Sequence, residues 1–154
     1  MNFLSKKLMF ASAAVILFFS SEILAGQKNV FGNDLKECTK GTGYYRDGLC
    51  NTGADDQGTH VMCAIVTQDF LDYTKSVGND LSTPSSYFKG LKPGDHWCLC
   101  GFRFEQARKV GHAPKVLLES THEKAVNFTP LEILKTFAQK WSLLLKFNLF
   151  INLV

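Results

Sequence analysis

Hydrophobic residues are grouped into a few short runs, which polar stretches rich in glycine separate. The chain is almost uninterruptedly apolar from His60 to Val66, a pattern typical of a strand that is covered on both faces. Two further short runs, residues 97–100 and 115–119, predict additional strands, and residues 126–128 are the candidate for a fourth. The pattern therefore predicts a small sheet.

Helical signals lie between these runs. Thr67 is a favourable N-cap for a helix over residues 68–77, and Gly78 is a favourable residue to end it. A second short helix is expected over residues 102–110, followed by Gly111. Strands and helices therefore alternate along this part of the chain.

A third helix is expected near the end of this pattern. Thr129 is its expected N-cap and Pro130 its first residue, and it should run to about Gln139. The order of elements predicts a single small α/β or α+β domain, with a three- to four-stranded sheet, about three helices and an irregular N-terminal segment over residues 26–59. Alternating strands and helices favour some parallel pairing. In a parallel sheet, His122 and the loop that starts at Gly78 would share one rim.

The first residues have the order of an export signal. Lys6 and Lys7 precede an uncharged stretch, residues 8–19, and the small residue Ala25 follows it. A helix of that stretch rises about 18 Å, which is short of a hydrocarbon core of roughly 30 Å. We therefore expect residues 1–25 to be a cleaved signal peptide and the protein to be exported, periplasmic or secreted. The alternative is an uncleaved N-terminal segment that anchors the protein to the inner membrane.

An apolar tail follows the expected globular domain. The domain should span residues 26–140 and the tail residues 141–154, where ten of the fourteen residues are apolar. The tail is too short to span a bilayer. Three interpretations stay open: it extends the last helix and packs on the domain, it contacts a membrane or a protein partner, or it comes from a shifted reading frame.

Composition narrows the class of protein. The chain has 154 residues, of which 45% are hydrophobic, and this excludes a wholly disordered chain. The net charge is only +3 and no basic run exceeds two residues, so we expect no nucleic-acid partner. The sequence has no phosphate-binding glycine loop, no Gly-x-Ser-x-Gly motif and no dinucleotide fingerprint, and it therefore names no reaction.

An ordered set of short motifs carries a family resemblance. The motifs are Asn29-Val30-Phe31-Gly32, Arg46-Asp47-Gly48, Cys50-Asn51-Thr52-Gly53, Gly78-Asn79-Asp80-Leu81-Ser82-Thr83-Pro84, Gly90-Leu91-Lys92-Pro93-Gly94-Asp95, Trp97-Cys98-Leu99-Cys100, Ala113-Pro114 and Glu119-Ser120-Thr121-His122-Glu123. Over about residues 29–139 the chain resembles Domain of Unknown Function 2237, a family of small, mostly bacterial proteins. The resemblance implies no reaction, cofactor or catalytic residue.

The chain departs from this family at two places. Members usually have two adjacent cysteines after the Arg-Asp-Gly turn, where this chain has Leu49 and then Cys50. Members also commonly lack an export signal and end near the last helix. The odd cysteine count and the exported location therefore need their own explanation.

Two cysteines and a histidine are the first candidates for chemistry. Cys98 and Cys100 are two residues apart on an expected strand, so their thiols should face the same side. With His122 they are candidate ligands of a soft metal ion such as zinc. The same three residues are candidates for a catalytic thiolate and its base. The paired Cys-x-x-Cys spacing of a strong zinc motif is absent.

Disulfide bonds are the competing use of the cysteines, because export leads to an oxidising compartment. Cys38 and Cys50 are the candidate pair across the irregular N-terminal segment, whereas Cys63 is expected to be a small core residue. Five cysteines leave at least one unpaired.

Polar residues in glycine-bearing loops are candidates for ligand binding. Carboxylates there could bind a cation or a polar ligand, although turn and cap chemistry is the favoured explanation. An ion pair within the Arg-Asp-Gly turn could also pin its loop. The candidates are Arg46, Asp47, Asn79, Asp80, Thr83 and Asp95, with Asp55 and Asp56 in the same class.

Two functional hypotheses follow. In the first, the chain is a domain that binds a small molecule or a metal ion, and it either catalyses an unknown reaction or only binds. Its site would lie near Cys98, Cys100, His122 and the loop from Asn79 to Thr83. In the second, it is a non-catalytic envelope protein with structural cysteines, and its tail contacts a membrane or a partner.

Overall fold

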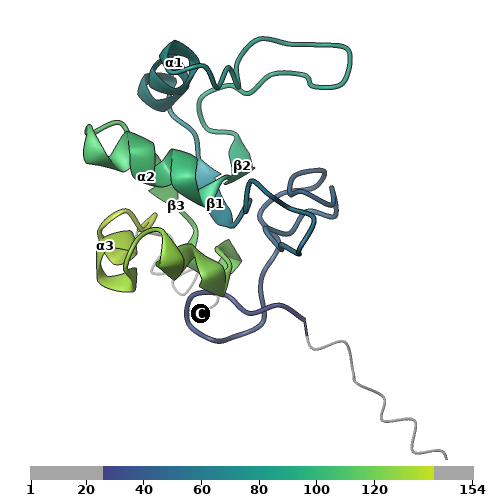
Figure 1. Cartoon of the computed structure of the whole chain (residues 1–154), viewed down its shortest axis with the longest axis vertical. Coiled ribbons are helices and arrows are strands. Elements are labelled where there is room, and N and C mark those ends of the chain that lie inside the picture. The colour runs from purple at the N-terminus through teal and green to yellow at the C-terminus, as the bar shows by residue number, and fades with distance from the viewer. Residues whose placement is uncertain (1–25, 141–154) are drawn as a thin grey trace, which may run out of the picture.

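A three-stranded antiparallel sheet forms the centre of the structure (Figure 1). The computed structural model describes residues 26–140, so the expected signal peptide and tail lie outside the described residues. β1 (Met62–Ile65) is central and pairs with β2 (His96–Leu99) on one side and β3 (Lys115–Val116) on the other. This is an α+β domain, one of the two classes that the sequence left open. Within residues 26–140, no helix is long and apolar enough to cross a membrane.

The predicted parallel pairing is wrong, because β1 and β2 run antiparallel. The chain that follows β1 turns back and begins β2 beside the end of β1. The N–H of Val66 donates to the C=O of Asp95 at 2.9 Å, and the N–H of Gly94 donates to the C=O of Val66 at 2.8 Å. β2 therefore starts beside the end of β1. The loop from Gly78 leads to this end, whereas the N–H of His122 bonds to the residue that precedes β1. His122 and the loop thus lie at opposite ends of the central strand.

Three α-helices and two 3-10 helices accompany the sheet within residues 26–140. Thr67 caps the first of them, since the N–H of Phe70 donates to its hydroxyl oxygen at 3.1 Å. The first two helices agree with the expected ones to within a residue or so, and the third is shorter. The elements are α1 (Gln68–Ser76), α2 (Gly101–Lys109), α3 (Leu131–Thr136) and two 3-10 helices, η1 (Leu118–Ser120) and η2 (Glu123–Asn127).

Local signals fail near the C-terminal end of the domain. The expected fourth strand, residues 126–128, is instead the end of η2 and the residue after it. Thr129 is buried and donates its hydroxyl to the carboxylate of Glu105 at 2.7 Å, so Pro130 takes the N-cap position of α3. A tertiary hydrogen bond to α2 therefore outweighs the capping signal of the sequence.

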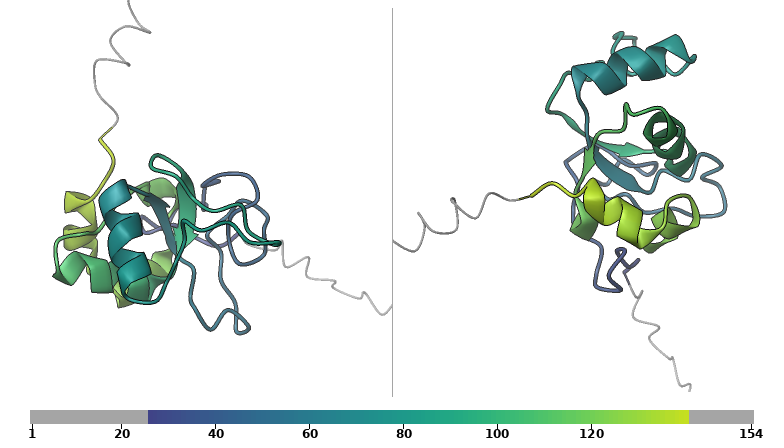
Figure 2. Two further views of the ribbon diagram at one scale, coloured as in Figure 1. Left: turned by 90° about the horizontal axis from the view of Figure 1, so that it is seen from above. Right: turned by 90° about the vertical axis from the view of Figure 1, so that its left-hand side faces the viewer.

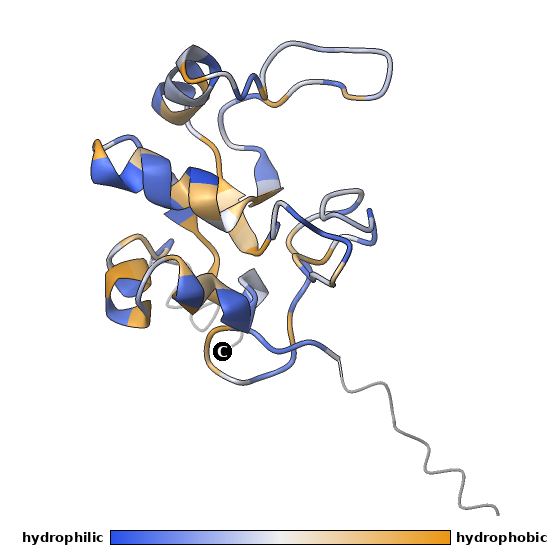
Figure 3. Ribbon diagram, viewed as in Figure 1, coloured by the Kyte–Doolittle hydropathy of each residue, from blue (hydrophilic) through white to orange (hydrophobic). Residues whose placement is uncertain are grey.

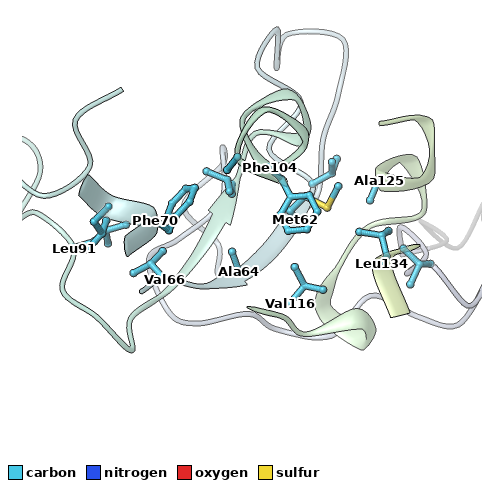
Figure 4. Close-up of a cluster of buried hydrophobic side chains, with 14 residues drawn as sticks. Met62, Ala64, Val66, Phe70, Leu91, Phe104, Val116, Ala125 and Leu134 are labelled. Carbon is cyan, nitrogen blue, oxygen red and sulfur yellow. The ribbon is translucent and has the colours of Figure 1, made fainter. Parts of the chain in front are cut away.

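The two faces of the sheet have different coverings. Because side chains alternate along a strand, Met62 and Ala64 face the helices, where they pack with Phe70 and Phe104 (Figure 4). Cys63 lies between them in the sequence and belongs to a separate buried cluster on the other face. Figure 2 (left) shows the helices on one side of the strands and the N-terminal loops on the other. In Figure 3, β1 is coloured as hydrophobic at the centre, and much of α2 is coloured as hydrophilic.

The start of α2 packs tightly against the turn that follows η2. A Cβ atom on Gly101 would lie 2.4 Å from the ring of Phe128. Real Cβ atoms essentially never approach so closely, so only glycine fits here without a shift of the ring or of the helix.

Candidate functional site

Four of the five cysteines meet on the sheet face opposite the helices. Cys63 on β1 and Cys98 on β2 are direct partners in the antiparallel register. Cys38 is bonded to Cys63 and Cys50 to Cys98, with Cα–Cα distances of 5.7 and 5.1 Å. The predicted Cys38–Cys50 bridge is therefore wrong. Cys63 is fully buried, as predicted for a small core residue, but it is bonded to Cys38 rather than free. The two cysteines of the N-terminal segment lie over neighbouring strands, and each bonds to the cysteine of one strand.

Buried threonines hold the backbone of this cluster. The N–H of Cys63 donates to the hydroxyl of Thr121 at 3.2 Å, and the N–H of Cys98 donates to the hydroxyl of Thr42 at 2.9 Å. Both amides therefore point away from the partner strand, which marks a non-hydrogen-bonded pair. Side chains of such pairs approach more closely than those of hydrogen-bonded pairs. This geometry brings the two disulfides against each other.

Cys100 is the one unpaired cysteine. It is half-buried and occupies the N-cap position of α2, just after β2 ends at Leu99. Cys98 is held in a disulfide and does not offer a thiolate in this state. The structure therefore does not assemble the candidate metal or catalytic set of Cys98, Cys100 and His122. Among the described residues, the sulfur atoms that lie within 4.8 Å of one another are those of Cys38, Cys50 and Cys63.

His122 has a structural environment. Its Nδ1 atom accepts the N–H of Lys124 at 2.9 Å and so caps η2, while its own N–H donates to the C=O of Val61 at 2.9 Å. Burial lowers the pKa of the imidazole below its ordinary value, which keeps the ring neutral. A neutral ring with Nδ1 as acceptor is the form that the cap requires.

A cleft of about 550 Å³ opens beside the disulfide cluster. The N-terminal segment, η1 and the residues after α3 form its walls. Most of the lining is apolar, and the side chains of Lys36 and Glu119 form an ion pair beside it. Cleft volumes of this size suit small organic molecules. The apolar lining residues are Phe31, Cys38, Leu117, Leu118 and Ala138.

His96 lies between this cleft and a second, smaller cavity. Its Nδ1 atom is 3.2 Å from the C=O of Cys38, and a carbonyl oxygen can only accept. Nδ1 therefore carries the proton, and Nε2 of the neutral ring is an acceptor. The smaller cavity, about 120 Å³, also has Lys40, Lys89 and Asp95 in its wall. His96 was not among the residues predicted from the sequence, where its only signal was a polar ring at the start of an apolar strand.

The candidates of the Arg-Asp-Gly turn serve local structure. The guanidinium of Arg46 lies 5.2 Å from the ring centroid of Trp97, a cation–π contact. Asp47 accepts the N–H of Leu49 at 3.0 Å and the side-chain amide of Asn51 at 2.8 Å. The carboxylate thus closes its own turn.

Asp80 closes the loop after α1 in the same way. Its carboxylate accepts the hydroxyl and the N–H of Thr83, at 2.6 and 3.0 Å, and pairs with Lys75 at 3.0 Å. The hydrogen bonds from Thr83 hold the pKa of Asp80 well below its usual range. Asn79 donates to the hydroxyl of Thr74 at 2.9 Å. Asp95 likewise accepts a local N–H at 2.9 Å, besides lining the smaller cavity.

A buried aspartate orients a second histidine in the N-terminal segment. Asp56 lies 2.6 Å from Nδ1 of His60 and accepts the backbone N–H of the same residue at 2.7 Å and the hydroxyl of Thr52 at 2.9 Å. Burial opposes the charge on Asp56, but these hydrogen bonds outweigh it and lower the pKa. Tyr44 stacks on His60, with ring centroids 6.1 Å apart. The four-residue spacing of the pair was the only signal for it in the sequence.

Fold and site together define a small α+β domain in which two disulfides join an irregular N-terminal segment to the sheet beside an open cleft. No curated protein matches the chain. The chain belongs to the DUF2237 family, described as "Uncharacterized protein conserved in bacteria", whose profile matches residues 28–138. This confirms the resemblance seen in the sequence.

Proposed function

We propose that the protein is an exported binding domain that holds a small, largely apolar molecule in the cleft between the N-terminal segment and η1. The observation that carries this proposal is the cleft of about 550 Å³, whose wall surface is mostly apolar and includes the ring of His96. Ligand sites typically combine such walls with a few polar groups that orient the ligand.

The polar groups define the chemistry of the ligand. Nε2 of His96 is an acceptor, so it would pair with a hydroxyl, amide or carboxylic acid proton of the ligand. The Lys36 ammonium and the Glu119 carboxylate are more than half exposed and pair with each other. They would contribute to the rim rather than to the affinity, because exposed ion pairs are weak.

A second candidate function has its own support. Four cysteines in two buried disulfides favour structural cysteines, as a non-catalytic envelope protein would have, and disulfides of this kind persist in oxidising compartments. The same bridges support a location in an oxidising compartment, to which residues 1–25 would bring the domain either as a cleaved signal peptide or as an uncleaved inner-membrane anchor. Contact of residues 141–154 with a membrane or a partner belongs to this candidate. An intact mass of the protein from the exporting host tests the cut after Ala25.

Binding of anilinonaphthalene sulfonate tests the cleft. This probe is apolar with one anionic end, and a ligand of its size should bind with a dissociation constant on the order of tens of micromolar. The variant Ala138→Phe fills the cleft and should weaken binding at least tenfold. The variant His96→Asn keeps a donor for the C=O of Cys38 but removes Nε2, the acceptor that would pair with the ligand.

The control variant is Phe102→Ala, in a separate shallow pocket between α1 and α2. Phe102 is 60% exposed, so its removal should leave the fold and the cleft unchanged. Equal fluorescence from the wild type and Ala138→Phe, or a loss of binding in Phe102→Ala alone, would show that the probe binds elsewhere. The proposal of a ligand cleft would then be rejected.

A further inference from the structure

We propose that the four clustered cysteines, once their two disulfides are reduced, form a tetrathiolate site for one Zn²⁺ ion. The ligands would be Cys38, Cys50, Cys63 and Cys98. This set differs from the candidate set of the sequence, since it contains neither Cys100 nor a histidine.

The geometry of the cluster suits four-coordinate zinc. The sulfur atoms of Cys38, Cys50 and Cys63 all lie within 4.8 Å of one another, and that of Cys98 is bonded to Cys50. With Zn–S bonds of about 2.3 Å, the sulfur atoms of a tetrahedral site are about 3.8 Å apart. The bonded sulfurs would therefore separate, and the sulfur of Cys98, which is outside that group of three, would move toward the others.

The backbone already holds two of the ligands in place. Cys63 and Cys98 face each other across β1 and β2, and Thr121 and Thr42 hold their amides. The strand pairing and these two hydrogen bonds involve no sulfur atom. Cys38 and Cys50 come from loops, which can move by the small distance that the metal requires.

The ion would enter from the cleft. Cys38 lines that cleft, whereas the other three cysteines are almost fully buried. Four thiolates and one Zn²⁺ carry two net negative charges. Lys36 and His96, which also line the cleft, supply cationic or hydrogen-bonding groups near Cys38.

The chemistry balances with a dithiol or a phosphine as the reductant. Reduction of the two disulfides takes four electrons and four protons, breaks both S–S bonds and gives four thiols. Two dithiol molecules supply them and become cyclic disulfides, or two phosphine molecules do so with two waters, whose oxygen atoms go to the phosphine oxides. Zn²⁺ then replaces the four thiol protons, which go to solvent. Soft thiolates in a tetrahedral set select zinc over the harder divalent cations.

Cobalt substitution tests the site on the full chain. The protein is reduced with tris(2-carboxyethyl)phosphine under argon, and Co²⁺ is added, followed by Zn²⁺. We expect one Co²⁺ per chain, with the visible bands of tetrahedral cobalt and the near-ultraviolet bands of cobalt–thiolate bonds. An equimolar amount of Zn²⁺ should remove these bands, because zinc binds such sites more tightly than cobalt. The oxidised protein should show none of them.

Two variants identify the ligands. Cys100→Ala should keep the full cobalt spectrum, whereas Cys50→Ala/Cys98→Ala should weaken binding by a hundredfold or more. In the zinc-bound wild type, iodoacetamide should modify Cys100 alone, and the near-ultraviolet circular dichroism should show ordered tertiary structure. That last measurement separates the folded site from loose binding by an unfolded thiol-rich chain.

Three results would overturn the proposal. The first is a reduced chain, folded or unfolded, that binds no stoichiometric cobalt. The second is a spectrum that Cys100→Ala abolishes. The third is metal binding without ordered tertiary structure. Each result is independent of the ligand test of the cleft, because the metal experiment uses no cleft ligand.

Discussion

Each disulfide should contribute several kcal/mol of stability through the unfolded chain. The perturbation is the removal of one bridge at a time, with Cys38→Ala/Cys63→Ala in one protein and Cys50→Ala/Cys98→Ala in the other. Both cysteines of a bridge are replaced, so that no new thiol is left to form another bond. Cys100→Ala is the control, since it removes a sulfur without removing a cross-link.

The magnitude follows from the lengths of the loops. The bridges join residues separated by 25 and 48 positions, and closing loops of these lengths corresponds to about 3.5 and about 4 kcal/mol of chain entropy. Cys50 lies nearly midway between Cys38 and Cys63 in the sequence. Closing one bridge therefore hardly shortens the loop that the other bridge has to close. The two contributions to the free energy of unfolding should add almost fully.

The assay is urea unfolding followed by far-ultraviolet circular dichroism. Either double variant should stay folded in buffer, with an unfolding free energy lower by about 3–5 kcal/mol once the lost packing of sulfur is included. The dependence of this free energy on urea should steepen, because the unfolded chain without a bridge is more expanded. Removal of all four cysteines should take away about 7 kcal/mol or more, which is comparable to the whole stability of a typical domain.

A small loss would refute this reasoning. If either double variant lost less than about 1 kcal/mol, the bridges would not constrain the unfolded chain as the loop lengths require. A loss in Cys100→Ala as large as in the double variants would point instead to the packing of sulfur as the cause.

Three further predictions concern single side chains. Burial lowers the folded-state pKa of His122, so its contribution to stability is fully present above its unfolded pKa of about 6.5 and falls as the pH drops below that value. The variant His122→Asn can accept the same N–H but does not titrate. It should therefore reduce the difference between the urea midpoints measured at pH 7.5 and at pH 5. Gly101→Ala should lower stability by about 1–3 kcal/mol in thermal unfolding, and Phe128→Leu in the same chain should recover part of that loss, whereas additive effects would argue against the contact. Asp56→Asn should reduce stability by about 2 kcal/mol at pH 7, where the carboxylate holds His60 and Thr52. Because the folded-state pKa of Asp56 is lowered, the difference in stability between variant and wild type should disappear as the pH falls through that pKa. A difference in urea midpoints that stays constant down to pH 2 would contradict the role given to the carboxylate.

The sequence predicted the elements better than their arrangement. Periodicity and capping located α1 and the central strand well, because Thr67 and the apolar run at β1 act locally. The antiparallel order depends on hydrogen bonds between Val66 and the end of the long loop, and no local signal encodes that return. Thr129 shows the same limit, since its partner lies on another helix.

The candidate site was predicted less well, for a related reason. The cysteines were correctly singled out by type, but their partners depend on which strand each loop crosses. The alternation rule for Cys98 and Cys100 assumed a strand through residue 100, whereas the strand ends at Leu99. His96 and the cleft could not be predicted, because the cleft forms only where the N-terminal segment, η1 and the end of α3 meet.

The interlocked order of the bridges has a consequence for the biosynthesis of an exported chain. If the chain is exported as proposed, N-terminus first, Cys38 and Cys50 would reach the oxidising side first, and both native partners would arrive later. An oxidase that joins thiols in order of arrival therefore produces the Cys38–Cys50 bond, which is absent from the native fold. Native pairing then requires a thiol to attack that bond and exchange it. If the protein is exported as proposed, the yield of native protein should accordingly depend on a disulfide isomerase, and not only on an oxidase.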